Sequence, residues 1–156
     1  MEHPELYGAA NAAQYIRSTR RPVPDFQNFL LKHSHELESI DLVVSSEEQK
    51  TELWELLKRN VSDIYITSSV HQLLELSHRD AGKHSGVRYV AELLGLTPDQ
   101  IAAFGDGDND ADMLRFVGCG IAVENASPAC LAAADFVTAH HREDGVARGI
   151  REILKI

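Results

Sequence analysis

The chain has 156 residues, of which 44% are hydrophobic, enough to bury a core in one ordinary domain or two small ones. Its formal net charge of -9 argues against a nucleic-acid partner, because such proteins cluster Lys and Arg and this sequence spreads them out. It has no apolar stretch near the roughly 20 residues that span a bilayer, and no basic segment followed by an apolar one at its start. Only two cysteines occur, Cys119 and Cys130, without a CxxC pattern. We therefore expect a cytoplasmic protein that binds neither nucleic acid nor membranes, with Cys119 as a buried, reduced thiol.

The first half of the chain is predicted to form a small α/β layer. Apolar residues at helical spacing predict helices over 8–19 and 25–36. Ser46, with Gln49 three positions later, forms a capping box that opens a third helix. Short runs of apolar and β-branched residues predict three strands, over 40–44, 63–68 and 72–77.

A polar stretch over 78–85 is predicted to be a linker, and the pattern changes after it. Val87, Val90, Ala91 and Leu94 recur at helical spacing, and that helix is expected to end at Gly95. A turn with the composition of a helix cap follows at 97–100. Strands and helices then alternate, with strands over 101–104, 120–123 and 136–138, a helix through Met113 to Val117, one that opens at Ser127 and a closing one over 146–154. This alternation predicts an α/β fold with a parallel sheet and helices on both faces.

An acidic loop follows the predicted strand over 101–104, and ligands of open α/β sheets bind at the carboxyl ends of strands. Four carboxylates stand at alternate positions in and after this loop: Asp106, Asp108, Asp110 and Asp112. Such charges repel one another unless a cation or hydrogen-bond donors lie among them, and oxygen ligands suit magnesium or calcium. Taken alone, such a loop is better explained as a solvated turn. A calcium loop of the EF-hand type is excluded, because Ala111 and Val117 stand where that motif requires Gly and Glu.

A family resemblance rests on two segments, IAAFGDGDNDADMLRFVGCGIAVENA and AADFVTAHHREDGVARGI. They resemble the closing part of the haloacid dehalogenase superfamily, specifically its Cof-type phosphatases, which carry a large inserted cap. The resemblance implies a Rossmann-like core for residues 82–156 and part of an α/β cap for residues 1–81. It also implies a magnesium-dependent phosphatase that acts on small phosphate esters through an aspartyl-phosphate intermediate.

The family's Gly-Asp-x-x-Asn-Asp motif matches Gly105 to Asp110. By this resemblance Asp106 is a magnesium ligand, Asn109 reaches the substrate phosphate, and Asp110 orients the catalytic site. Lys83, which stands 12 residues before Gly95, matches the family's phosphate-binding lysine and is implied to hold the phosphoryl oxygens and the charge of the nucleophile.

The sequence departs from the family pattern in two places. His84 stands where the family often has glycine after its lysine, so either the turn there is less tight or His84 projects toward the site as a catalytic base. The second departure concerns the nucleophile, because no Asp-x-Asp-x-Thr motif occurs in residues 1–80. The chain is therefore expected to start inside the cap of a longer phosphatase and to be inactive alone.

Three functions fit these observations. The first is the C-terminal part of a magnesium-dependent phosphatase. The second is a non-catalytic protein that binds phosphate or metal or regulates a partner, and the third is one half of a split enzyme. Because the strand over 101–104 would lie beside the missing nucleophile strand, we also expect its bare edge to pair with another copy of the chain or with the missing N-terminal segment.

Overall fold

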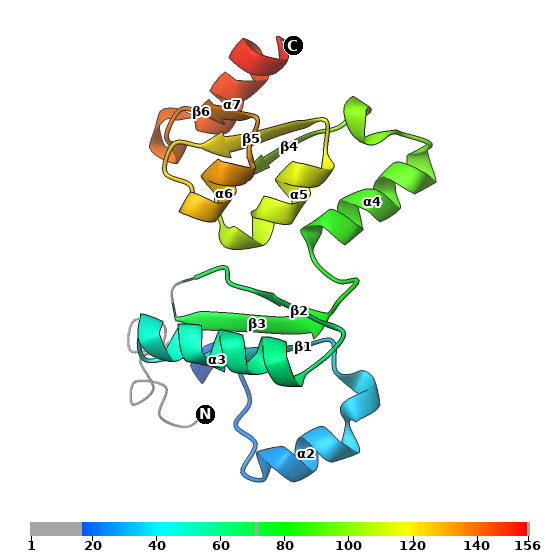
Figure 1. Cartoon of the computed structure of the whole chain (residues 1–156), viewed down its shortest axis with the longest axis vertical. Helices are drawn as coiled ribbons and strands as arrows, with labels where there is room; N and C mark the ends of the chain where they lie inside the picture. Colours follow the sequence, from blue (N-terminus) through cyan, green and yellow to red (C-terminus); the bar gives the residue numbers. More distant parts are fainter. Residues whose placement is uncertain (1–16, 71, 156) are drawn as a thin grey trace. The chain divides into compact units, whose positions relative to one another are not determined.

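The computed structural model describes residues 17–70 and 72–155 (Figure 1). The chain divides into two compact units, Met1–Arg79 and Asp80–Ile156. The predicted helix over 8–19 falls mostly outside the described residues, of which 17–19 are helical. Among the described residues no helix has the length and apolar character needed to cross a membrane.

The first unit is built on a three-stranded antiparallel sheet in the order β1-β3-β2 (Figure 1). Strand β1 spans Ser39–Val43, β2 spans Ile64–Thr67 and β3 spans Leu73–His78. Helix α3, Glu47–Asn60, contacts the central strand β3. Val44 and Leu74, which are 1% and 0% exposed, are its fully buried apolar side chains among the described residues. The three predicted strands and the helix after Ser46 are confirmed within a residue or two at their ends.

Two local features of this unit differ from their predictions. The helix predicted over 25–36 is α2, Phe26–Lys32, followed by a separate 3₁₀ turn, η3, Ser34–Glu36. The capping box is half formed, because Ser46 Oγ accepts from the Gln49 N–H at 3.2 Å. Gln49 Oε1 accepts instead from the Ser45 N–H at 2.7 Å, one residue earlier than the motif predicts.

The second unit alternates helices and strands along the chain. Its helices and helical turns are α4 (Lys83–Leu94), η4 (Pro98–Gln100), η5 (Asp108–Asp110), α5 (Ala111–Phe116), α6 (Pro128–Ala133), η6 (His141–Glu143), α7 (Gly145–Gly149) and a π-helical turn, η7 (Ile150–Leu154). Its strands are β4 (Ala102–Gly105), β5 (Cys119–Val123) and β6 (Phe136–Thr138). The predicted linker over 78–85 is shorter than expected, because β3 continues to His78 and α4 begins at Lys83.

Three predicted helix signals can be compared with these elements. Gly95 ends α4 in the left-handed conformation, with φ 67°, as a C-terminal glycine is expected to do. Gln100 supplies its half of a capping box on η4, because its Oε1 accepts from the Thr97 N–H at 3.0 Å. The closing helix predicted over 146–154 is confirmed in extent, because α7 runs without a break into η7, which ends at Leu154. After Gly149 the hydrogen-bonding pattern widens to that of a π-helix, and no residue in the sequence signals this change.

The strands of the second unit form a parallel sheet in the order β4-β5-β6, in which Gly105 pairs with Ala122. Neighbouring residues of a strand face opposite sides of a sheet. A Cβ on Gly105 would lie 3.2 Å from Cys130 Sγ of α6, whereas the Phe104 ring lies against Gly149 of α7. Helices α6 and α7 therefore cover opposite faces, and the predicted α/β fold with a parallel sheet and helices on both faces is confirmed (Figure 1).

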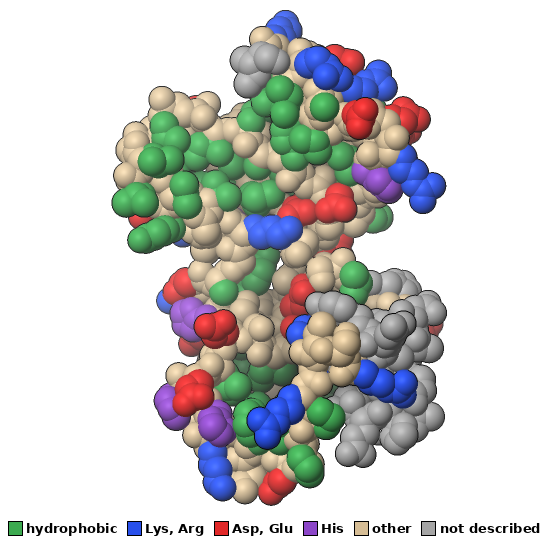
Figure 2. Space-filling model, turned by 180° about the vertical axis from the view of Figure 1, so that it is seen from behind, with side chains coloured by type: hydrophobic (Ala, Val, Ile, Leu, Met, Phe, Trp, Pro, Cys, Tyr) green, Lys and Arg blue, Asp and Glu red, His purple; other side chains and the backbone are tan. Residues whose placement is uncertain are grey.

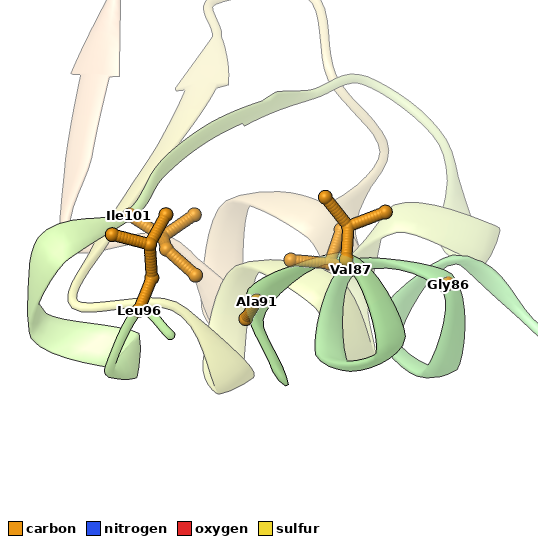
Figure 3. A pocket seen from close by; sticks show the side chains of 6 residues that line it. Gly86, Val87, Ala91, Leu96 and Ile101 are labelled. Atoms are coloured by element: carbon orange, nitrogen blue, oxygen red, sulfur yellow. The ribbon is translucent and has the colours of Figure 1, made fainter. Parts of the chain in front are cut away.

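Helix α4 leaves apolar side chains at the surface of this unit, and Figure 2 shows hydrophobic side chains gathered over it. Val90, Leu93 and Leu94 are 51%, 72% and 64% exposed. Beside them α4 and the segment before β4 enclose a groove of about 240 Å³ (Figure 3). Its lining is Gly86, Val87, Val90, Ala91, Leu96 and Ile101. Strand β4 is an edge of the sheet among the described strands.

The packing of β5 against α5 predicts opposite effects of alanine at two glycines. A Cβ on Gly120 would lie 2.6 Å from the Leu114 carbonyl oxygen, whereas one on Gly86, inside α4, meets nothing within 4 Å. We expect Gly120→Ala to lower the free energy of unfolding by about 1–3 kcal/mol through overpacking. Gly86→Ala should raise it by about 0.5–1 kcal/mol, because alanine favours the helix. Urea unfolding followed by far-UV circular dichroism measures both; equal midpoints for the two variants would contradict the packing described.

Candidate active site

The candidate site lies where β4 ends, at the carboxyl edge of the parallel sheet. Asp106 follows Gly105, the last residue of β4, and the chain turns at once into η5 and α5. The loop after β5 lies beside it, because the Ser127 N–H donates to the Asp106 carbonyl oxygen at 2.8 Å. The acidic loop therefore occupies the position at which open α/β sheets bind ligands.

Asp110 is the buried centre of this loop. Its residue is 3% exposed, and both of its carboxylate oxygens accept hydrogen bonds. The side chain of Lys83 donates to Oδ1. The backbone N–H groups of Asp106 and Gly107 donate to Oδ2, at 2.9 and 3.0 Å. A carboxylate so occupied holds the loop in shape.

The charge state of Asp110 follows from two opposed effects. Burial raises the pKa of the carboxyl group, and the hydrogen bonds from Lys83, Asp106 and Gly107 lower it. The hydrogen bonds prevail, so the pKa lies below the ordinary value of 3.8. Asp110 is therefore ionised at neutral pH and forms an ion pair with Lys83.

Lys83 is the first residue of α4, and its side chain is 50% exposed. The preceding Gly82 has φ 107°, a conformation that glycine adopts readily, and this turn brings the chain into the helix beside η5. An ammonium group has three N–H donors, of which Asp110 accepts one. Lys83 can therefore bind an anion while its position remains fixed by Asp110.

The other side chains of the loop differ from Asp110 in exposure. Asp106 and Asp108 are exposed, and Asn109 is half-buried. Asp112 pairs with Arg115 at 2.9 Å on the surface of α5. The four alternating carboxylates thus separate into one buried group, two exposed groups and one surface ion pair, and their mutual repulsion is relieved mainly by Lys83 and backbone N–H donors.

The donor set fits a magnesium ion only in part. In the described chain no group of three or more His, Cys, Asp or Glu side chains is arranged to enclose a metal ion. Magnesium, however, is often held by one or two carboxylates together with waters and substrate phosphate. The exposed Asp106 carboxylate, on a backbone held at both its N–H and its C=O, is a suitable single ligand of this kind.

Cys130 lies directly behind the loop, on α6. It is 0% exposed, and burial together with the charges of Asp110, Asp106 and Asp108 raises the pKa of its thiol to about 11. A Cβ at Gly105 would lie 2.6 Å from the Asp110 Cβ and 3.2 Å from Cys130 Sγ. Glycine is therefore required at position 105 for Asp110 to pack here.

Cys119 was expected to be buried and is only half-buried. Both cysteines are free thiols.

Two further expectations concern nearby residues. His84 is half-buried, and its Nε2 lies 3.1 Å from Ser85 Oγ on the same helix.

Ser127 was predicted only to open α6, and it does so, because its Oγ accepts from the Cys130 N–H at 3.3 Å. The contact between its own N–H and Asp106 was missed. The adjacency of β4 and β5 was the signal that would have found it, since loops after neighbouring parallel strands meet at one edge.

The apolar groove of Figure 3 is separate in chemistry from this site. Its lining carries none of Lys83, Asp106, Asn109 or Asp110. A phosphate group needs hydrogen-bond donors and positive charge, which the lining residues do not offer. The candidate active site is therefore the polar loop at the end of β4.

The ion pair predicts a pH dependence of stability. Because the folded pKa of Asp110 is lowered, its contribution is complete well above pH 3.8 and is lost as the pH falls through the folded pKa. We expect Asp110→Asn to lower the free energy of unfolding at pH 7 by about 1–3 kcal/mol. The difference between wild type and variant should shrink below pH 3.8. Urea unfolding from pH 3 to 8 measures this, with exposed Asp108→Asn as the control, and a constant difference over that range would contradict it.

Comparison with known proteins identifies the family. The model of the haloacid dehalogenase-like hydrolases matches residues 6–150. A Haemophilus influenzae protein, provisionally named a phosphatase, is 34% identical over 139 residues, which are 88% of this chain and 52% of that protein. A 5-amino-6-(5-phospho-D-ribitylamino)uracil phosphatase of Bacillus subtilis is 37% identical over 84 residues, 54% of this chain and 31% of the relative.

A solved structure agrees with the sequence comparison. A haloacid dehalogenase-like hydrolase from B. subtilis superposes with a TM-score of 0.70 and 30% identity, over 74% of this chain and 40% of that one. The chain thus spans about half, or less, of the length of the proteins it matches. The match over residues 6–150 and the α/β fold show that this chain belongs to the haloacid dehalogenase-like hydrolase family.

Proposed function

We propose that the Asp80–Ile156 unit carries the magnesium- and phosphate-binding half of a phosphatase site, and that the Met1–Arg79 unit is part of a cap over such a site. The observation that carries this proposal is the Asp110 carboxylate, which joins the Lys83 ammonium group to the backbone of Asp106. Residues 27 positions apart are thereby fixed around one loop at the carboxyl end of β4.

Lys83 binds the substrate phosphate and stabilises the charge of the attacking group. Its ammonium group is half exposed, and its ion pair with Asp110 fixes the position of the side chain. Asn109 supplies amide N–H donors to the phosphate oxygens from the same loop. Groups held in place before the substrate arrives need no reorganisation when charge develops, which is why such an arrangement lowers a reaction barrier.

Asp106 holds the magnesium ion. When bound, magnesium neutralises negative charge on the phosphate oxygens and on the attacking carboxylate. Asp106 fits this role because it is exposed, whereas Asp110 is buried and already accepts hydrogen bonds at both of its carboxylate oxygens.

The nucleophile is an aspartate in an Asp-x-Asp-x-Thr segment that the present sequence does not contain. Its carboxylate attacks phosphorus, the bond from phosphorus to the ester oxygen breaks, and that oxygen takes a proton and leaves as the alcohol. Water then attacks the phosphorus of the aspartyl-phosphate, and the bond from phosphorus to the aspartate oxygen breaks, which releases inorganic phosphate and restores the carboxylate. The position of β4 at an edge of the sheet, among the described strands, supports this proposal, since a strand paired parallel to it there would bring its carboxyl end beside Asp106.

The substrate class is a small phosphorylated metabolite in the cytoplasm. The name of the B. subtilis relative specifies a phosphorylated ribitylamino-uracil, a compound of this class. The cap is expected to select the leaving group, because the residues of the loop after β4 address only the phosphate. A cytoplasmic location is supported by the two free cysteines.

A second candidate function is a protein that binds phosphate or metal without turnover, or that serves as one half of a split enzyme. The absence of an Asp-x-Asp-x-Thr motif from these 156 residues favours it. The reading frame around the coding sequence separates these cases, since an in-frame motif upstream indicates one longer enzyme and a separate small frame indicates a split one.

The 156-residue chain should not hydrolyse a generic phosphate ester above background, because its sequence contains no Asp-x-Asp-x-Thr segment to supply the nucleophile. Release of phosphate from p-nitrophenyl phosphate with magnesium measures this. Magnesium-dependent turnover that disappears in Asp106→Ala would show that the nucleophile lies within this chain, and the proposed division of the site would then be wrong.

Activity should appear when a strand-forming segment that carries Asp-x-Asp-x-Thr is supplied in trans or fused before the chain. The edge of β4 and the apolar groove beside α4 offer that segment unpaired backbone groups and apolar surface. The matched control is the same segment with its first aspartate replaced by asparagine. It should bind equally well, and shift the chain from self-associated species to a defined complex in sedimentation, yet give no turnover.

A further inference from the structure

Asp106 is held at both of its backbone polar groups, by two different parts of the fold. Its N–H donates to Asp110 Oδ2 at 2.9 Å. Its carbonyl oxygen accepts from the Ser127 N–H at 2.8 Å. Peptide groups are planar, so when the peptides before and after Asp106 are both held in place, the direction of its Cα–Cβ bond is determined. The exposed carboxylate therefore leaves the backbone along a direction set from two sides.

The Ser127 amide is placed by the loop between β5 and α6. The Ala126 N–H donates to the Val123 carbonyl at 2.9 Å, and the Ala126 side chain is 8% exposed. On the other side, Ser127 caps α6, accepting from the Cys130 N–H at its Oγ and from the Leu131 N–H at its carbonyl, at 3.3 and 2.9 Å. The N–H of an N-cap residue has no partner within its own helix, so it is free to serve Asp106.

Asn125 joins the same loop to the next one. Its Oδ1 accepts from the His141 N–H at 3.0 Å, at the start of η6. The Glu124 N–H also points to the Ala139 carbonyl oxygen, at 3.5 Å. The loops after β4, β5 and β6 are thus linked in series across the carboxyl edge of the sheet.

We propose that Ser127 is a positioning residue for the cation site, acting through its backbone N–H on the Asp106 carbonyl, and that Asn125 braces its loop. The inference rests on the proposed role of Asp106. Without the Ser127 bond, the peptide group between Asp106 and Gly107 would be held only by the Gly107 N–H on Asp110 Oδ2, so part of its order would have to be gained when the cation binds. Fixing a whole residue costs conformational entropy that corresponds to a loss of about tenfold in affinity, which is the upper limit of the effect.

The test compares Ser127→Pro with Ser127→Ala. Both lose the Oγ cap of α6, and only proline loses the N–H that Asp106 accepts. The backbone of Ser127, with φ -61°, is compatible with proline, whose Cδ replaces the N–H and displaces the Asp106 carbonyl oxygen. Magnesium chloride is titrated into the ¹⁵N-labelled chain, and the dissociation constant is taken from amide shifts of the loop after β4. Ser127→Pro should bind magnesium more weakly than Ser127→Ala, by up to about tenfold, although both remain folded by circular dichroism.

Asp106→Ala separates failure of this inference from failure of the proposed function. If Asp106→Ala binds magnesium as the wild type does, the proposed cation site is wrong, and this inference falls with it. If Asp106→Ala abolishes binding while Ser127→Pro and Ser127→Ala bind equally, only the role of Ser127 is overturned. Should Ser127→Pro fail to fold, Asn125→Ala decides instead: weaker magnesium binding by the folded variant supports the inference, and wild-type affinity overturns it.

Discussion

The candidate site depends on one buried charge. The Asp110 carboxylate is inside the protein, and an ionised group there is tolerated only when donors replace the water that it has lost. Those donors come from α4 through Lys83 and from the loop through two backbone N–H groups. The shape of the loop, the position of Lys83 and the exposure of Asp106 are thus consequences of satisfying one carboxylate. The packing of Asp110 also requires glycine at position 105, because a side chain there would occupy the space that Asp110 fills.

The parallel sheet explains why these groups meet at all. Parallel strands end at the same edge, so the turns after β4, β5 and β6 are neighbours in space although they are distant along the chain. Hydrogen bonds join these three turns to one another. One of them runs from the His141 N–H to the Asn125 side chain. The first unit contributes a sheet of another kind, antiparallel, and its described residues contain few fully buried apolar side chains.

Most of the fold could be predicted from the sequence, because it is set by local signals. Gly95 ends a helix, Ser46 begins one, and the run of Phe136 to Thr138 has the bounds of β6. The acidic loop and Lys83 were found from their motif, although their roles remain predictions. What could not be predicted depends on contacts between distant residues. The two bonds to Asp110 Oδ2 and the amide of Ser127 involve main-chain groups that every residue except proline possesses, so no residue type marks them. The π-helical turn after Gly149 has no local signal either.

The thiol of Cys130 has a consequence for the chemistry of the loop in front of it. With a pKa of about 11 it stays protonated at physiological pH, so it adds no negative charge behind carboxylates that already repel one another. A thiol in this form is also a poor nucleophile, and burial denies oxidants and alkylating reagents access to it. The protein can therefore place a sulfur atom against the acidic loop after β4 without making that loop sensitive to the redox state of the cell.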